Sequence, residues 1–107
     1  MPKKALNPLT EPMFYVLLCF HIRETSGNEI AEYVARMTED RVRMGPGTLY
    51  TILSTFLSEK LIVKERSEGR KIYYSITEKG EKFYQDEVNR LRKCVLDADK
   101  ADREKML

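Results

Sequence analysis

A mainly helical α+β fold is predicted by three observations on this chain of 107 residues. Apolar residues recur at helical spacing in its first half. The pattern then changes to strand-like alternation around residues 61–76, and a long helical stripe follows from residue 77. Short helices, a two-stranded hairpin and a final long helix are typical of a winged helix-turn-helix with a C-terminal helix. We therefore expect a winged helix-turn-helix DNA-binding domain over residues 1–76 and a dimerisation helix over residues 77–107.

The charge distribution indicates one locally basic surface on a single small domain. The formal net charge is only +2, which by itself is weak support for a nucleic-acid partner. Residues 41–71, however, carry seven basic and three acidic side chains, whereas the charges cancel from residue 77 onward. A positive field confined to one part of the chain favours an anionic partner at that part.

The first helix is predicted to begin after Thr10. The threonine hydroxyl suits an N-cap, and Glu11 and Pro12 suit the first helical turn. Nearly every residue from 13 to 22 is apolar, which is typical of a helix buried on all sides. We therefore expect this helix at the centre of the core.

A capping box is expected to open the second helix. Ser26 is the expected cap, and Glu29 is the residue expected to reach back to it. The helix should continue to about Met37, with Ile30, Val34 and Met37 facing the core. A charged connection then leads to the third helix.

The third helix, expected over residues 47–60, has an unusual outer face. It follows the turn sequence Gly45-Pro46-Gly47, and its apolar positions 49, 52, 53, 56 and 57 fall on one side. The opposite side holds four short, uncharged polar residues: Thr51, Ser54, Thr55 and Ser58. An exposed helix face usually carries Lys and Glu, so we expect this one to lie against a partner, with a DNA major groove as the first candidate.

A basic β-hairpin is predicted directly after this helix. Residues 61–63 begin a β-type run, residues 67–69 form a turn, and residues 71–76 alternate with Ile72, Tyr74 and Ile76 on one side. The basic residues that flank the turn are Lys64, Arg66, Arg70 and Lys71. Beside a neutral polar helix face, such a hairpin is expected to act as a wing that contacts DNA.

An apolar stripe runs along the final helix, which is expected to start at Thr77. Its members recur at heptad-like spacing: Tyr84, Val88, Leu91, Val95 and Ala98. Burying one large apolar side chain is worth roughly 1.5–3 kcal/mol, so a solvated stripe would be costly for a small domain. It could fold back on the domain, but an identical helix of a second chain is the simpler solution, and we expect a homodimer.

Other functional classes receive little support from the sequence. A single histidine, with no paired nucleophile and base and no metal-ligand cluster, argues against an enzyme, so we expect no catalytic residue, metal or cofactor. Cys19 and Cys94 lie in apolar segments and are expected to be reduced, small hydrophobic side chains. No apolar run could span a membrane, and we expect a cytoplasmic protein.

The competing hypothesis is a winged-helix module that binds other proteins, although the neutral face lacks typical hot-spot residues.

Two segments carry a family resemblance. Gly47-Thr48-Leu49-Tyr50 and, later, Tyr74 with Ile76-Thr77-Glu78-Lys79-Gly80 resemble the PadR-like transcriptional regulators, and the likeness extends over about residues 9–80. It implies a winged helix-turn-helix domain, a dimerising C-terminal helix and repression from a palindromic operator. The single terminal helix is similar to the small subgroup of that family, some members of which bind flat aromatic or drug-like ligands at the dimer centre.

The chain departs from the family pattern at three positions. Asn28 stands where an aromatic is frequent, Thr51 where a proline is common, and Lys60 where a glycine commonly ends the third helix. Ligand-binding members often use C-terminal tryptophans, and this chain contains no tryptophan. If a small aromatic or apolar effector binds, we expect its pocket to be lined by Met13, Tyr15, Tyr84, Leu91 and Val95. The alternative is that these residues only pack within an ordinary interface.

The expected double-stranded DNA contacts combine the third helix, the wing and the start of the second helix. Thr48 and the first N–H groups of the third helix suit a phosphate, and Tyr50 is either a core edge or a phosphate contact. A basic arm with Lys3 and Lys4 is expected to reach a minor groove. The full set of contacts predicted in the winged helix-turn-helix domain is Asn28, Gly47, Thr48, Tyr50, Thr51, Ser54, Thr55, Lys64, Arg66, Arg70 and Lys71.

Overall fold

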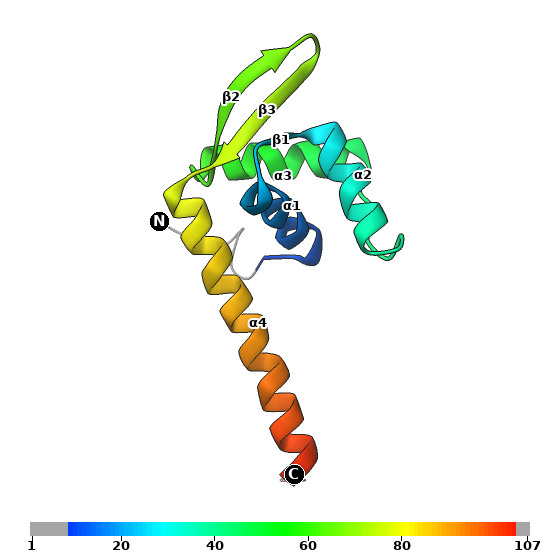
Figure 1. Cartoon of the computed structure of the whole chain (residues 1–107), viewed down its shortest axis with the longest axis vertical. Helices are drawn as coiled ribbons and strands as arrows, with labels where there is room; N and C mark the ends of the chain where they lie inside the picture. The colour runs from blue at the N-terminus through cyan, green and yellow to red at the C-terminus, as the bar shows by residue number, and fades with distance from the viewer. Residues whose placement is uncertain (1–8, 105–107) are drawn as a thin grey trace.

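The computed structural model describes residues 9–104 and confirms the predicted winged helix-turn-helix architecture (Figure 1). The elements of this range are α1 (Glu11–Ile22), β1 (Thr25–Ser26), α2 (Gly27–Met37), α3 (Pro46–Ser58), β2 (Ile62–Glu68), β3 (Lys71–Ile76) and α4 (Glu78–Glu104). The hairpin β2–β3 projects from one end of the helical body, and the C-terminal half of α4 extends away from the other (Figure 1). Lys3 and Lys4 lie outside the described residues.

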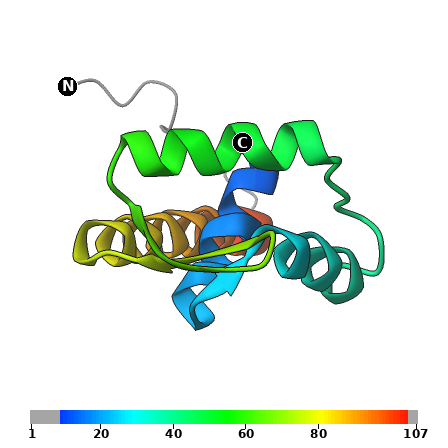
Figure 2. The same cartoon turned by 90° about the horizontal axis from the view of Figure 1, so that it is seen from above.

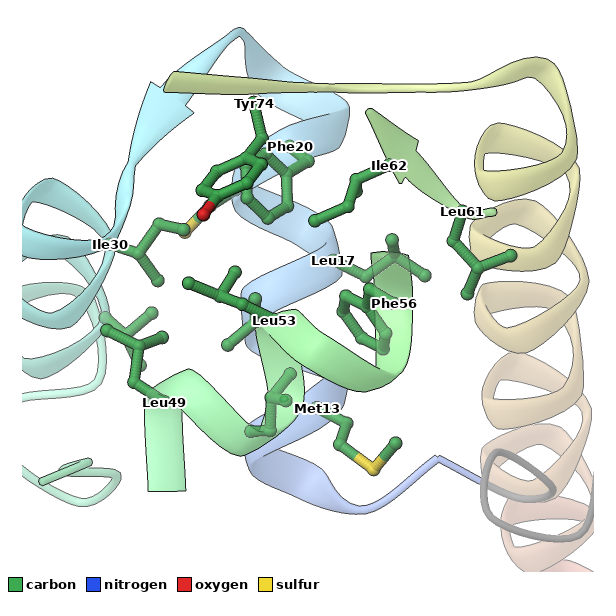
Figure 3. Close-up of a cluster of buried hydrophobic side chains, with 14 of the residues drawn as sticks. Met13, Leu17, Phe20, Ile30, Leu49, Leu53, Phe56, Leu61, Ile62 and Tyr74 are labelled. Carbon is green, nitrogen blue, oxygen red and sulfur yellow. The ribbon is translucent and has the colours of Figure 1, made fainter. Parts of the chain in front are cut away.

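The hydrophobic core is built around α1. Val16, Leu17 and Phe20 of this helix are at most 1% exposed. Leu17 and Phe20 lie in one cluster with Phe56 of α3 and Ile62 of β2, which are equally buried (Figure 3). Seen from above, α1 lies between α2 and α4, with α3 running across it (Figure 2). The prediction of a central helix apolar on nearly every side is therefore confirmed.

Two predicted helix caps are confirmed, and for the third the N-cap position is confirmed but the capping box is wrong. Thr10 Oγ1 accepts a hydrogen bond from the Met13 N–H at 3.2 Å, and Thr77 Oγ1 accepts one from the Gly80 N–H at 3.0 Å. Ser26 precedes α2, but its side chain makes no capping hydrogen bond. Glu29 instead accepts a hydrogen bond from Thr25 Oγ1 at 2.8 Å. The capping box fails because Ser26 belongs to a buried strand.

That strand, β1, is too short to be read from a periodic pattern. It pairs antiparallel with β3, Thr25 opposite Tyr74 and Ser26 opposite Tyr73, and gives a sheet of order β1-β3-β2. The predicted hairpin is confirmed, with Gly69 at its tip at a φ of 62°. The register between β2 and β3 shifts between Lys64 and Arg66, which indicates a β-bulge.

Some residues predicted to be buried are exposed. Met37 and Leu57, at the ends of α2 and α3, lie partly in solvent because these ends extend beyond the core. Cys19 is buried as predicted, and burial raises the pKa of its thiol to about 12, so it stays protonated. Cys94 is also a free cysteine, but it is exposed on the projecting half of α4.

The junction of α3 and α4 explains why Thr77 and Gly80 stand in the segment Thr77-Glu78-Lys79-Gly80. Lys60 takes a left-handed backbone, with φ at 64°, which lets the Leu61 N–H bond to the Phe56 carbonyl and end α3. The Thr77 N–H donates to the Leu61 carbonyl at 2.9 Å. Gly80 faces that carbonyl so closely that a Cβ there would clash with its oxygen. The first turn of α4 is thereby held against the end of α3.

A polar contact ties the start of α4 to the end of α1. Gln85 donates a hydrogen bond to Glu81 at 2.9 Å, and His21 Nδ1 lies 2.9 and 3.0 Å from the two carboxylate oxygens of Glu81. These contacts, that of Gln85 first, lower the pKa of Glu81 below its ordinary value. The pKa of Glu81 is lower in the folded than in the unfolded chain, so the ionised carboxylate stabilises the folded state. This stabilisation is fully present above the ordinary pKa of Glu, about 4.3, and is lost as the pH falls through the pKa of the folded state.

We expect Glu81→Gln to remove this acid-sensitive contribution. At pH 7 the variant should be less stable than the wild type by less than about 1 kcal/mol, since the carboxylate is partly solvated. The difference should shrink as the pH falls below the lowered pKa of Glu81, because the protonated carboxyl is then as neutral as the glutamine amide. Urea unfolding at pH 7 and pH 3 measures it, and Glu78→Gln in the same helical turn controls for the helix dipole. If the difference in unfolding free energy were the same at pH 3 as at pH 7, the charge of Glu81 would not be its cause.

Candidate nucleic-acid interface

The outer face of α3 is exposed and carries no charge. Thr48, Thr51, Ser54 and Ser58 are exposed and Thr55 is half-buried, whereas Leu49, Ile52, Leu53 and Phe56 on the other side are buried. Figure 2 shows α3 at one edge of the molecule, and no other helix or strand of residues 9–104 covers its outer side. The helix therefore presents hydroxyl and methyl groups to a partner, at the positions that the sequence indicated.

The first turn of α3 offers unoccupied backbone donors. Gly45 is its N-cap and supplies no side-chain hydrogen bond, and Pro46 opens the helix. Gly47 and Thr48 are exposed, and a Cβ added at Gly45 or at Gly47 would meet open space within 4 Å. This end of the helix suits an oxyanion, because its N–H groups carry the positive end of the helix dipole.

Asn28, Tyr50, Arg70 and Lys71 are brought together although they lie far apart in the sequence. They line a hollow of about 200 Å³ between the start of α2, the middle of α3 and the wing residues that follow Gly69. Tyr50 is 58% exposed, so the alternative in which it forms a core edge is wrong. Four of the predicted DNA contacts thus share one surface.

Arg66 is engaged within its own chain. Its guanidinium forms an ion pair with Glu24 and a second with Glu68 at 2.9 Å, and it lies 4.2 Å from the centroid of the Tyr73 ring. This arrangement ties the wing to the loop that follows α1. It was not predictable from the sequence, in which Glu24 is remote from the hairpin.

The other wing cations remain available. Lys64, Arg70 and Lys71 are exposed, and none of them forms an ion pair with another residue of the range 9–104. Arg41, by contrast, donates to Glu11 at 2.5 Å and to the Tyr15 hydroxyl at 3.1 Å, contacts that raise the pKa of its guanidinium. The basic character predicted for residues 41–71 is therefore concentrated in the wing.

The predicted dimerisation stripe divides into two parts. Tyr84 is only 8% exposed, because it stacks on Phe14 and His21 of α1 with ring centroids 5.7 and 4.3 Å apart. Val88 packs at the edge of the same core. Tyr84 thus has little surface to offer a second chain. The first turns of α4 fold back on α1, as one of the alternatives for this helix allowed.

The second part of the stripe lies on the projecting half of α4. Leu91 is partly exposed and Val95 is 60% exposed, and Ala98 is exposed beyond them. Leu96, which the heptad-like spacing did not include, is also exposed. A hollow of about 440 Å³ is lined here by Phe14, Val88, Leu91, Arg92, Val95 and Leu96.

Within residues 9–104, none of the cavities described here brings together all five residues expected to form an effector pocket. Met13 and Tyr84 are buried in the core, and the Tyr15 hydroxyl accepts a hydrogen bond from Arg41. Leu91 and Val95 alone among the five line the apolar hollow on α4. The reason is that α1 and α4 pack directly together, which fills the space with side chains.

Other kinds of site find no support in residues 9–104. No three His, Cys, Asp or Glu side chains in this range gather closely enough to hold a metal ion. None of its helices is both long and apolar enough to cross a membrane. The buried carboxylate of Glu87 is paired with Arg90, whose guanidinium nitrogens lie 2.6 and 3.1 Å from its oxygens.

Comparison with known proteins gives a consistent picture. The model of the Transcriptional regulator PadR-like family matches residues 16–86. A search of curated protein sequences gave no match. Among solved structures, a transcriptional regulator from Clostridium thermocellum is similar, with a TM-score of 0.75, 18% identity and coverage of 94% of this chain and 96% of that one.

Two further structures share the fold. A PadR family transcription regulator from Clostridium difficile has a TM-score of 0.74 and 23% identity, and covers 85% of this chain and 97% of its own. RosR of H. salinarum has a TM-score of 0.69 and 18% identity, with coverage of 94% and 97%. At these identities the likeness establishes the fold.

Proposed function

Because this chain belongs to the PadR-like family of transcriptional regulators, we propose that it is a repressor that binds a palindromic DNA operator as a homodimer. The observation that carries the proposal is the exposed, uncharged face of α3 beside the unpaired cations of the wing. A major groove admits a helix of this kind, and the wing cations lie where they can neutralise neighbouring phosphates.

The residues of α3 determine how the bases are read. Thr51, Ser54 and Thr55 offer hydroxyls that donate or accept, and the threonine methyl groups suit the thymine methyl. The face carries no Arg, Asn or Gln for bidentate pairs with a base. Each base contact is therefore weak, and part of the sequence preference comes from the wing and from the shape of the DNA.

The projecting half of α4 supplies the proposed dimer contact. Leu91, Val95 and Leu96 are the large exposed apolar residues of this segment, and a second copy of the helix buries them. The two α3 helices then enter major grooves about one helical turn apart, roughly 34 Å. A small apolar or aromatic effector that occupies the hollow beside these residues would compete with the dimer contact and release the operator.

The salt dependence of DNA binding tests the electrostatic part of the proposal. With about four phosphates neutralised per subunit, the slope of log affinity against log salt should be roughly −7. Arg70→Ala should weaken binding to all sequences and reduce this slope by about two per dimer. Arg66→Ala is the matched control, because its guanidinium is already paired with Glu24 and Glu68. Fluorescence anisotropy over a potassium chloride series measures both, and a slope near zero for the wild type would contradict DNA binding.

The role of α3 is tested separately, by measuring which DNA sequences the protein prefers. Thr51→Ala should relax the preference at one or two base pairs per half-site, with non-specific affinity unchanged, because it removes one hydroxyl and one methyl contact. Selection of random duplexes by the wild type and the variant gives the measurement. If the wild type enriches no inverted repeat, the protein-interaction module becomes the better hypothesis.

A further inference from the structure

A β-bulge in the wing decides which side chain of β2 lies opposite Tyr73. The ladder pairs Lys64 with Tyr74, so Glu65 would stand opposite Tyr73 if the pairing continued without interruption. The register shifts at this point, and Arg66 takes that place instead. A bulge of this kind redirects the side chains that follow it. The irregularity therefore puts a cation where an uninterrupted ladder would put a carboxylate.

The guanidinium of Arg66 reaches across the central strand of the sheet. In the ladder, Tyr73 of β3 stands between Arg66 of β2 and Ser26 of β1, and the guanidinium lies 4.2 Å from the centroid of the Tyr73 ring. It also forms an ion pair with Glu24, in the segment between α1 and β1. Within residues 9–104, the buried oxygen of Glu24 has no partner other than Arg66. We call the group Glu24, Tyr73 and Arg66 the wing clamp.

The wing clamp supplements a weak attachment of the hairpin to the helical body. β1 is two residues long, and it pairs only with Tyr73 and Tyr74 of β3. β2 lies on the other edge of the sheet and is not adjacent to β1. The far end of the hairpin, where Arg70 and Lys71 lie, projects from the body (Figure 1). An ion pair that crosses β3 joins β2 to the body and opposes rotation of the wing about its base.

The orientation of the wing determines where its cations lie relative to α3. Arg70 and Lys71 form no ion pair within residues 9–104, and they line one hollow with Tyr50 of α3. A surface that is ordered before binding loses less conformational entropy on association than one that is ordered by its partner. Because Arg66 is already paired, its influence on binding is exerted through the wing.

We propose that Glu24 is a positioning residue for DNA binding. By holding Arg66 across β3, it fixes the wing in the orientation in which Arg70 and Lys71 reach phosphates beside the groove that α3 enters. Glu24 itself does not touch the DNA. The role in binding rests on the function proposed above, whereas the order of the wing in the free protein does not.

The decisive variant is Glu24→Ala, which removes the carboxylate that holds Arg66. Glu68→Ala is the matched control, because Glu68 also pairs with Arg66 but belongs to the same strand, so that this pair does not cross the sheet. The side chains of Glu24 and Arg66 are partly exposed, and the unfolding temperature of Glu24→Ala should therefore stay within about 5 °C of the wild type. Circular dichroism confirms that each variant is folded.

The first arm measures the orientation of the wing in the absence of DNA. Residual dipolar couplings of the backbone amides are recorded for the free full chain. In the wild type and in Glu68→Ala, the couplings of β2 and β3 should fit the same rigid orientation as those of α1, α2 and α3. In Glu24→Ala and in Arg66→Ala, the couplings of the hairpin should be reduced together, because the wing samples several orientations. Couplings that fit the wild-type orientation in both variants would overturn the proposal, whatever the protein binds.

The second arm measures affinity for the selected operator by anisotropy over a potassium chloride series. Glu24→Ala should lose about tenfold in affinity, because the wing must then be ordered on binding. The salt slope should stay equal to that of the wild type, since Arg70 and Lys71 still release the same counterions. The double variant with Arg66→Ala should be no weaker than Glu24→Ala, because both changes break the same contact. Glu68→Ala should not weaken binding.

The outcomes separate the positioning role from simple electrostatics and from the proposed function. Removal of an acidic side chain by itself favours a polyanion, so a loss of affinity in Glu24→Ala supports positioning. A higher affinity with a steeper slope, absent from the double variant, would show that Glu24 only withholds Arg66 from a phosphate and would overturn the proposal. Unchanged affinity would overturn it as well, while the proposed function stands. If the wild type binds no duplex, the proposed function and the positioning role both fail, and the first arm still decides whether the clamp orders the wing.

Discussion

Gly80→Ala is expected to destabilise the domain by at least about 2 kcal/mol, a large effect for the addition of one methyl group. The added Cβ would clash with the carbonyl oxygen of Leu61 and would lie 2.7 Å from a side-chain carbon of Ile76. A backbone oxygen cannot rotate away as a side chain can. The first turn of α4 must therefore move away from the end of α3, which breaks the contacts that Thr77 makes with Leu61.

Thermal unfolding measures this effect against a control within the same chain. For a domain of about this size, 2 kcal/mol corresponds to a fall in Tm of roughly 10 °C. Gly47→Ala is the control, because nothing lies within 4 Å of its Cβ position and alanine favours a helix by up to about 1 kcal/mol. Its Tm should be equal or higher. A Gly80→Ala variant with the wild-type Tm would mean that α4 is not held against Leu61 as described.

Leu91→Glu combined with Val95→Glu is expected to give a monomer that has lost most of its operator affinity. Both side chains lie on the projecting half of α4, where they are exposed in the single chain, so the monomer should remain folded. In a dimer, however, two charges on each helix would be buried without partners. A monomer binds one half-site only, and the loss of the linked second site should cost a hundredfold or more in affinity.

Light scattering at micromolar concentration and anisotropy with the selected operator provide the two measurements. Ala101→Glu adds a carboxylate to the same helix, and at roughly 100° per residue it points about 80° away from Leu91 and about 120° away from Val95. It should leave both the dimer and the affinity unchanged. A wild-type chain that is monomeric would refute the dimer, and a double variant that remains dimeric would place the interface elsewhere.

The wing shows where sequence reasoning reached its limit. Strand alternation and the turn at Gly69 predicted the hairpin, because these signals are local in the chain. All four wing cations had the same predicted role, yet Arg66 is occupied by Glu24, Glu68 and the Tyr73 ring. The availability of a charged side chain depends on which distant residues the fold brings to it.

The apolar stripe of α4 illustrates the same limit. Its heptad-like spacing predicted a helix with one apolar side, and α4 has one. Spacing alone did not determine that Tyr84 stacks on α1 whereas Val95 stays exposed, since both belong to the same periodic pattern. The division depends on where α4 leaves the domain, which is set by the junction with α3.

The sequence by itself determined the order and type of the main elements, the central position of α1, the caps at Thr10 and Thr77 and the neutral outer face of α3. Each follows from periodicity or from contacts between residues a few positions apart. Only the tertiary structure decided the pairing of β1 with β3, the close approach at Gly80 and the ion pair of Glu24 with Arg66. These features join segments distant in the chain, and their geometry depends on how the helices and the sheet pack together.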